Sequence, residues 1–310
     1  MTRSIPFESY EDGLLALALA DQRFVVLTAE NRSAIRNLPG ALGERFIDFG
    51  ICEQTMIGAA AGLALRGRIP LVHALAAFLT LRAFEFIRTD IGIAGLPVKL
   101  IGTFTGFTSE ANGPTHQSLE DVALMRGIPG MKVWCPADEK DLLHGLEAVL
   151  LDPAPCYIRY NAMMPRVHHD PEFRIGQAEI HAKGGDATLL SYGTMFGECA
   201  LAAELLRQSG YSVGLVNMRM LKPLDRDTLL EAARNSRLLV TVEDHFRNGG
   251  LYTALAETLV ESGVRAPVLP IALDERWFKP ALLADVLAYE GFTAEALAGA
   301  IAERLAVIRA

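Results

Sequence analysis

Short apolar runs alternate with longer segments of helical periodicity along almost the whole chain, and this alternation constrains the fold more than any other feature. Strands that are joined through helices pair in parallel, because a parallel pair needs a long crossover connection. The pattern therefore predicts an α/β fold built on doubly wound parallel sheets. In the first half, the predicted strands are residues 24–28, 45–49, 71–75, 98–102, 132–135 and 156–160. The predicted helices are residues 10–20, 53–65, 79–93, 120–126 and 139–151.

The rhythm breaks after residue 162, where Pro165, Pro171 and the pair Gly184-Gly185 favour turns. A second and shorter α/β series follows. Its predicted strands are residues 188–192, 212–217, 238–242 and 268–271, and its predicted helices are residues 198–207, 226–235, 251–261 and 294–306. We therefore predict two doubly wound domains, at residues 1–162 and 187–310, with a linker at residues 163–186.

Composition bounds the class of protein. The chain has 310 residues with 51% hydrophobic content, enough to bury two cores. Its net charge of −8 argues against nucleic acid as a partner, because phosphate backbones select basic surfaces. No signal-like segment occurs, and no apolar stretch reaches membrane-spanning length without polar interruption. The cysteines Cys52, Cys135, Cys156 and Cys199 are scattered, so we expect reduced thiols and no metal site. These features predict a globular cytoplasmic protein that binds neither nucleic acid nor membranes.

Glu53 stands where a short strand passes through Gly50 into a helix rich in glycine and alanine. Proteins of the α/β class bind ligands beyond the carboxyl ends of their strands, and small side chains let a flat ligand approach the backbone. This placement is typical of a working carboxylate. An acidic residue in the first turn also stabilises a helix through its dipole, so the residue pattern alone leaves a structural role open.

Three further segments accompany the one around Glu53. They are Gly-Pro-Thr-His-Gln-Ser-Leu-Glu-Asp at 113–121, Ile-Pro-Gly-Met-Lys-Val-Trp-Cys-Pro-Ala-Asp at 128–138 and Thr-Val-Glu-Asp-His-Phe-Arg-Asn-Gly-Gly at 241–250. In this order the segments resemble the transketolase family of thiamine diphosphate enzymes, from residue 7 to about residue 300. The resemblance implies a pyrimidine-binding thiamine diphosphate fold followed by a smaller transketolase C-terminal domain. It also implies that residues 243–245 serve domain packing.

The resemblance assigns cofactor-binding roles to Glu53, Phe78 and Ile51. It implies that Glu53 is catalytic: its carboxyl group hydrogen-bonds N1′ of the aminopyrimidine of thiamine diphosphate and so promotes loss of the thiazolium C2 proton. Small apolar neighbours suit this role, because desolvation raises the basicity of a carboxylate. Phe78 is expected to stack on the aminopyrimidine. Arg82 and Arg88, on the same predicted helix, are expected at the surface or in a subunit contact.

His116 corresponds to a family histidine that faces the carbonyl and first hydroxyl of the donor ketose. The resemblance therefore implies a catalytic and substrate-binding role for it, including proton transfer. Asn112 stands where the family usually carries a substrate-binding aspartate, and it keeps the size of that side chain without its charge. The implied reaction moves a two-carbon ketol unit from a ketose donor to an aldehyde acceptor.

The family's phosphate-binding positions are largely changed. Ser33 is retained as a substrate-binding residue, whereas Phe7, Phe104 and Ala162 stand where the family has cationic residues. Losing cationic donors removes charge-assisted hydrogen bonds to a phosphate. We therefore expect an unphosphorylated or otherwise unusual substrate, unless neighbouring arginines compensate. The arginines near enough in the alignment are Arg32, Arg36, Arg159 and Arg166.

The family binds the cofactor's diphosphate through a metal ion held by a Gly-Asp-Gly segment, and no such triplet occurs in this chain. The resemblance thus implies a split transketolase, in which a partner subunit with the amino-terminal section holds the diphosphate through Mg²⁺ or Ca²⁺. Because the family pairs pyrimidine-binding domains about a two-fold axis, we expect self-association and a heterotetramer with two copies of each chain.

Three alternatives stay open. The first is the β subunit of the decarboxylating component of a 2-oxo acid dehydrogenase, although the segments at 113–121 and 241–250 favour transketolase. The second is an enzyme similar to deoxyxylulose-phosphate synthase, which requires pyruvate and releases carbon dioxide. The third is a non-enzymatic scaffold subunit, and the joint presence of Glu53, Phe78 and His116 argues against it.

Overall fold

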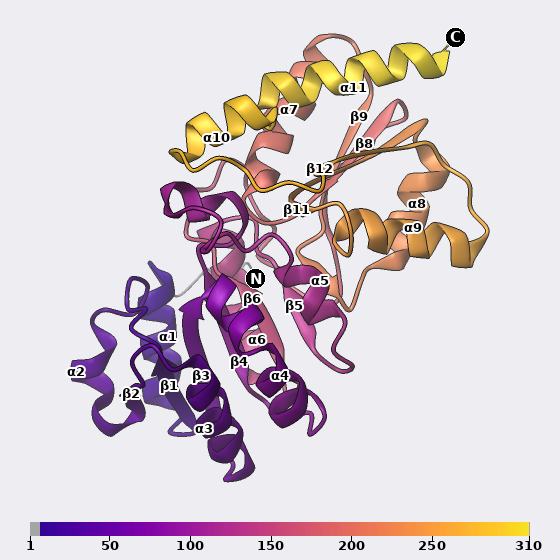
Figure 1. Ribbon diagram of the computed structural model, residues 1–310. Helices are drawn as coiled ribbons and strands as arrows, with labels where there is room; N and C mark the ends of the chain where they lie inside the picture. Colours follow the sequence, from indigo (N-terminus) through magenta and orange to yellow (C-terminus); the bar gives the residue numbers. More distant parts are fainter. Residues whose placement is uncertain (1–6, 310) are drawn as a thin grey trace.

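Two β-sheets organise the chain, one in each half, as Figure 1 shows for this computed structural model, which describes residues 7–309. The first sheet has the strand order β10-β5-β6-β4-β3-β1-β2. All neighbouring strands in it are parallel except β10 and β5. Its strands are β1 (Phe24–Thr28), β2 (Phe46–Asp48), β3 (Ile69–Leu75), β4 (Lys99–Thr103), β5 (Lys132–Trp134), β6 (Cys156–Arg159) and β10 (Met220–Lys222).

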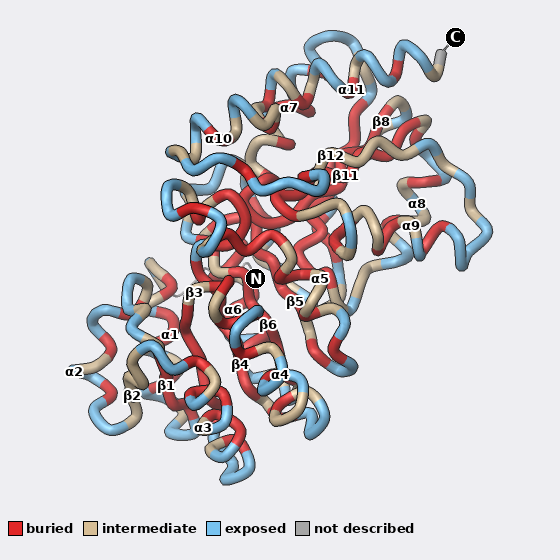
Figure 2. The backbone as a smooth tube through the Cα atoms, in the orientation of Figure 1, coloured by how far each residue is buried: buried red, intermediate tan, exposed pale blue. Residues whose placement is uncertain are grey.

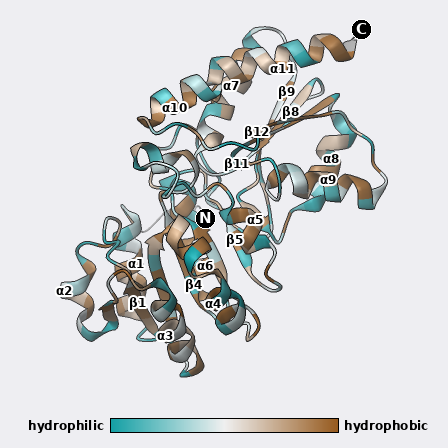
Figure 3. Ribbon diagram, in the orientation of Figure 1, coloured by the Kyte–Doolittle hydropathy of each residue, from teal (hydrophilic) through white to brown (hydrophobic). Residues whose placement is uncertain are grey.

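Helices cover both faces of this sheet, because successive residues of a strand point to opposite faces. In β1, Val25 and Leu27 lie in one hydrophobic cluster with α3, whereas Phe24 and Val26 lie in another with α1 and α6. Figure 2 shows the buried strands between helices with exposed outer faces. Figure 3 shows the hydropathy of each residue in the same orientation. The predicted doubly wound architecture is confirmed. The helices and 3₁₀ turns of this half are α1 (Tyr10–Ala20), α2 (Leu38–Leu42), η1 (Gly43–Arg45), α3 (Glu53–Leu65), η4 (Gly106–Asn112), α5 (Asp121–Arg126) and α6 (Glu139–Leu151).

The segment after β3 differs from the single α-helix predicted at residues 79–93. It winds as a π-helical turn η2 (Phe78–Arg82), a short α-helical turn α4 (Phe84–Phe86) and a second π-helical turn η3 (Ile87–Gly92). A π-helical turn takes up an additional residue and occurs frequently at functional sites. The side chains of this segment therefore follow a different register from that of the predicted helix.

The second sheet is smaller, as predicted, with the strand order β12-β11-β8-β9-β7. Helices α7 and α11 pack together on one side of it, and α8 and α9 pack together on the other (Figure 1). Within residues 7–309, no helix is both long and apolar enough to cross a membrane. The strands are β7 (Glu179–Ala182), β8 (Ala187–Ser191), β9 (Val213–Asn217), β11 (Leu238–Phe246) and β12 (Val268–Leu273). The helices are α7 (Met195–Gln208), α8 (Arg226–Asn235), α9 (Leu251–Ser262), α10 (Leu283–Glu290) and α11 (Ala294–Arg309).

The sequence does not predict two of these strands. Strand β7 lies in the segment predicted as a linker, because the prolines and glycines around it favour turns. It pairs antiparallel with β9. Strand β10 comes from the second half of the chain but adds to the first sheet, where Met220 pairs with Trp134 of β5. A three-residue strand whose partner lies in the other half of the chain leaves no local pattern to read.

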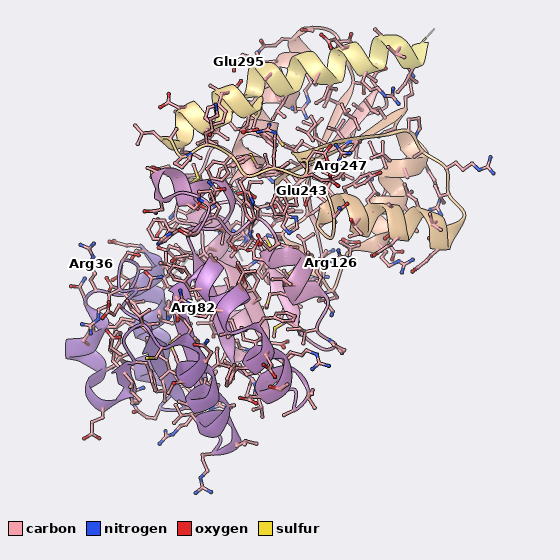
Figure 4. The ribbon with its side chains drawn as sticks, in the orientation of Figure 1. Arg36, Arg82, Arg126, Glu243, Arg247 and Glu295 are labelled. Carbon is pink, nitrogen blue, oxygen red and sulfur yellow. The ribbon has the colours of Figure 1, made fainter. Side chains whose placement is uncertain are left out.

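A buried group of charged side chains, here called the Arg159 cluster, joins the two halves. Arg159 donates through Nε to Asp121 Oδ2 at 2.9 Å and through Nη1 to Asp244 Oδ1 at 2.7 Å. All three side chains are buried. Burial opposes the charge of Arg159, but the two carboxylates outweigh this effect and raise its pKa well above the usual value. Glu243, labelled in Figure 4, accepts the first backbone N–H groups of α9. Residues 243–245 thus contact both domains, as the family resemblance implies.

A second buried group, the His169 cluster, lies where α6 meets the second sheet. His169 Nε2 lies 2.8 Å from Asp138 Oδ2, and His169 Nδ1 lies 2.7 Å from Glu179 Oε2. Asn217 donates from Nδ2 to Glu179 Oε2 at 3.1 Å and to Asp141 Oδ2 at 2.9 Å. Because each imidazole nitrogen faces a carboxylate, the doubly protonated ring satisfies both contacts.

The His169 cluster predicts a pH dependence of stability. Burial disfavours the charge, but the hydrogen bonds to Asp138 and Glu179 outweigh it and raise the pKa of His169 to about 10. An unfolded chain has a histidine pKa of about 6.5. The cluster therefore contributes stability that is complete below about pH 6.5 and is lost as the pH rises through about 10. We expect His169→Asn to lower the free energy of unfolding more at about pH 6 than at about pH 10.

Urea unfolding at both pH values measures this effect. The matched control is His168→Asn, because His168 is an exposed neighbour and its replacement should cost the same small amount at either pH. An equal loss at the two pH values for His169→Asn would contradict the charged state assigned to His169.

Candidate active site

Three parallel strands deliver Glu53, Phe78 and His116 to one edge of the first sheet. Glu53 follows β2, Phe78 follows β3, and His116 lies in the long loop after β4. In the sheet these strands lie in the order β4-β3-β1-β2 and run parallel, so their carboxyl ends meet at the same edge. The topology therefore brings together residues that lie far apart in the sequence.

Glu53 is the first residue of α3 and is only 2% exposed. Its Oε2 accepts a hydrogen bond from Arg82 Nη1 at 2.9 Å. The Arg82 guanidinium carbon lies 4.2 Å from the centroid of the Phe78 ring. The Phe78 ring in turn meets the His116 ring edge to face, with centroids 5.0 Å apart. Glu53, Arg82, Phe78 and His116 thus form one contiguous set, here called the Glu53 group.

Arg82 is the member that the sequence does not predict as a site residue. The sequence analysis predicts it at the surface or in a subunit contact, and its side chain is 39% exposed. Figure 4 labels it in the first domain. The signal that could have found it is its spacing of four residues from Phe78 within one helical turn, which lets a guanidinium lie over the aromatic ring.

Residues of the second domain contact the loop that carries His116 and hold it in place. Gln117 Nε2 donates to the carbonyl oxygen of Phe278 at 2.9 Å. Gly106, in the same loop, has a φ of 53°, and a Cβ built there would lie 1.9 Å from Asp244 Oδ2. This position therefore requires glycine both for its backbone and for its approach to the Arg159 cluster. Within this anchored loop, His116 Nδ1 lies 2.9 Å from the Thr115 hydroxyl.

The other predicted site residues lie at the surface. Ile51, predicted to bind the cofactor, is 65% exposed, and the substrate-binding candidates Asn112 and Ser33 are exposed as well. Ser33 donates to Asn31 Oδ1 at 3.2 Å. Among the described residues, no hydrogen bond or ring contact links Ile51, Asn112 or Ser33 to the Glu53 group.

The four arginines that the sequence places near the family's phosphate-binding positions differ in how far they are engaged. Arg159 is only 2% exposed and is ion-paired with both Asp121 and Asp244. Arg32 is paired with Asp48, and Arg166 is paired with Glu198. Arg36 is exposed and lies at the periphery of the first domain in Figure 4.

One group of side chains within residues 7–309 has the composition of a metal site: His169, Glu179 and His181. A metal ligand must offer a lone pair, and both ring nitrogens of His169 already face carboxylates. Glu179 Oε2 also receives a hydrogen bond from Asn217, and Glu179 Oε1 receives one from the backbone of Asp170. These donors occupy the carboxylate, so the group fits a buried hydrogen-bond network rather than a cation site.

The fold and the residues at its sheet edge define a class: two-domain α/β proteins with a pyrimidine-binding thiamine diphosphate fold and a smaller second domain. Comparison with models of known protein families supports this class. The transketolase pyrimidine-binding domain matches residues 7–166, and the transketolase C-terminal domain matches residues 176–297. The chain belongs to the transketolase family.

Individual relatives fall on the split branch of this family and on a related synthase. The chain is 39% identical to the 6-deoxy-6-sulfo-D-fructose transketolase subunit SqwH of Clostridium sp. (strain MSTE9), covering 82% of this chain and 80% of the relative. A solved structure described as a split gene transketolase, inactive beta4 tetramer, has 33% identity and a TM-score of 0.86, covering 96% of this chain and 97% of its own. The 1-deoxy-D-xylulose-5-phosphate synthase of Synechococcus sp. (strain JA-3-3Ab) is 33% identical over 96% of this chain, which spans 46% of that enzyme.

Proposed function

We propose that the chain is the carboxy-terminal subunit of a split transketolase that uses thiamine diphosphate to pass a two-carbon ketol unit from a ketose to an aldehyde. The observation that carries the proposal is the Glu53 group. In it a buried carboxylate, an aromatic ring and a histidine lie near one another in space at one edge of the sheet, linked by successive contacts. When bound, thiamine diphosphate supplies a nucleophilic C2 carbon for cleaving and forming bonds next to a carbonyl group.

The residues present fit the aminopyrimidine of this cofactor. The Glu53 carboxylate already accepts a hydrogen bond from a planar N–H donor, and the Phe78 ring already has a planar cation over its face. In the proposed mechanism Glu53 holds the proton at N1′, and Phe78 orients the aminopyrimidine by stacking. His116, next to Phe78, hydrogen-bonds the donor's carbonyl and first hydroxyl and moves the hydroxyl proton.

We further propose that the substrate lacks the usual sugar phosphate. Phe104 and Ala162, which stand where the family has cationic residues, are both exposed. Three of the four candidate arginines are committed to ion pairs. The name of the Clostridium relative includes a sulfonated fructose that carries no phosphate, which supports an unphosphorylated ketose as the donor.

A partner subunit is part of the proposal. The partner, carrying the amino-terminal section, holds the diphosphate through Mg²⁺ or Ca²⁺, and two copies of each chain form a heterotetramer. The split-gene neighbour is described as an inactive tetramer of β chains, which supports both self-association of such a subunit and its need for a second chain. Closed symmetric assemblies of this kind are the common outcome for soluble oligomers.

Reconstitution with a protein that carries the amino-terminal section tests the proposed function. Calorimetry should detect thiamine diphosphate binding by the pair and none by this chain alone. Ketol transfer from 6-deoxy-6-sulfofructose should exceed transfer from xylulose 5-phosphate to ribose 5-phosphate by about tenfold or more, because a sulfonate carries one negative charge, whereas a phosphate monoester carries close to two and loses more where cationic donors are few. Efficient formation of sedoheptulose 7-phosphate would refute the proposed substrate class. A pair that binds no cofactor would refute the enzymatic role and favour a scaffold.

A reaction like that of deoxyxylulose-phosphate synthase is the second candidate, because that enzyme aligns with nearly the whole chain. It joins a two-carbon unit from pyruvate to an aldehyde and releases carbon dioxide. Supplying the reconstituted pair with pyruvate and glyceraldehyde 3-phosphate separates the two. Release of carbon dioxide, with no ketol transfer from a ketose, would favour the synthase.

A further inference from the structure

Arg82 makes the same two contacts that the proposed function assigns to the aminopyrimidine. Its Nη1 donates to Glu53 Oε2 at 2.9 Å, and its guanidinium carbon lies 4.2 Å from the centroid of the Phe78 ring. These partners are the carboxylate that should hold N1′ and the ring that should stack on the cofactor.

The chemistry of the two groups explains the coincidence. A guanidinium is planar and delocalised, stacks on aromatic faces and directs N–H donors outward in its plane. An aminopyrimidine protonated at N1′ has the same planarity and the same kind of donor. Phe78 offers one ring face to Arg82, and the rings of Phe78 and His116 meet in a T-shaped arrangement. One ring face holds one planar group at van der Waals distance, so guanidinium and aminopyrimidine exclude each other there.

Burial shows that Arg82 can leave and that Glu53 cannot. Glu53 is 2% exposed, and a buried carboxylate needs a partner that stabilises its charge. The Arg82 side chain is 39% exposed, so its guanidinium can turn into solvent about its own rotatable bonds. Arg159 provides the contrast within the same domain: it is 2% exposed and held by two carboxylates, so it is fixed.

We propose that Arg82 occupies the aminopyrimidine position in the cofactor-free protein, where it pairs with Glu53 and covers Phe78, and that thiamine diphosphate displaces it. This inference rests on the proposed function. Arg82 is then a positioning residue: it keeps the carboxylate paired and the ring covered until the cofactor takes over both contacts. Cofactor binding must break the contacts of Arg82 with Glu53 and Phe78. The free energy lost with these contacts weakens the measured affinity for the cofactor.

The test is the affinity of the reconstituted pair for thiamine diphosphate, measured by calorimetry. Arg82→Ala removes the competitor, so the Kd should fall about tenfold, as expected for the loss of one ion pair with cation–π contact. Arg82→Lys keeps a cation beside Glu53, but its ammonium group is not flat and cannot cover the Phe78 ring. Its Kd should therefore lie between those of the wild type and Arg82→Ala. Without cofactor, Arg82→Ala should melt at a lower temperature than the wild type, and it should gain more from added cofactor.

The matched control is Arg88→Ala, which removes the same charge from an exposed position six residues along the same helical segment. Its Kd should equal that of the wild type. An unchanged or weaker affinity in Arg82→Ala, with normal binding by the wild type, would overturn the inference alone. Absence of binding by the wild-type pair would overturn the proposed function and the inference together.

Discussion

Replacing Glu53→Gln is expected to slow ketol transfer by the reconstituted pair by about 10²–10⁴-fold, the range typical of losing a positioned general acid or base. The amide keeps the size of the side chain and an oxygen that can accept the Arg82 hydrogen bond. It cannot hold and release the proton at N1′. The free energy of unfolding should change by no more than about 1 kcal/mol, because the partner Arg82 is partly exposed. Steady-state kinetics and urea unfolding measure the two quantities.

The control for this prediction is Glu85→Gln, which makes the same chemical change at an exposed position of α4. It should leave the rate within a factor of about two, as expected for a surface substitution. Near-normal turnover by Glu53→Gln would refute the catalytic assignment. A large loss of stability in the same variant would instead support the structural role that the sequence pattern left open.

Replacing Arg159→Met is expected to cost about 3–5 kcal/mol of stability, the range measured when one partner of a buried ion pair is removed. The change leaves the carboxylates of Asp121 and Asp244 buried without their cation. Arg159→Lys should fall between this variant and the wild type, because a single ammonium cannot reach both carboxylates as the guanidinium fork does. Urea unfolding measures each variant against the wild type.

The matched control is Arg226→Met, which breaks the ion pair with Glu261 on the surface. Both of those side chains are about half exposed, so the expected cost is at most about 1 kcal/mol. If Arg159→Met costs no more than this control, the Arg159 cluster is not what holds the two halves together. Because Asp244 also abuts Gly106 of the His116 loop, Arg159→Met should in addition weaken substrate binding.

Local sequence patterns predicted most of the fold, and the family motifs predicted three of the four residues of the Glu53 group. The strand that became β1 is a run of five apolar or β-branched residues, and such runs favour strands wherever they lie. The family motifs predicted Glu53, Phe78 and His116 as site residues, and the strand order brings these three to one edge of the first sheet. Strand β10 escaped prediction because its hydrogen bonds go to β5, far away in the sequence. The π-helical turns at residues 78–92 escaped because an α-helical register was assumed.

The amino-acid sequence by itself determined most of the strands and helices, the two-domain plan and the motifs of the transketolase family, because these depend on side chains close together along the chain. Only the tertiary structure decided that Arg82 pairs with Glu53, that the second domain anchors the His116 loop, and that Arg159 lies buried between two carboxylates. The physical reason is that such contacts join distant segments. Their energies depend on burial and on distances between atoms, which arise only when the chain has folded.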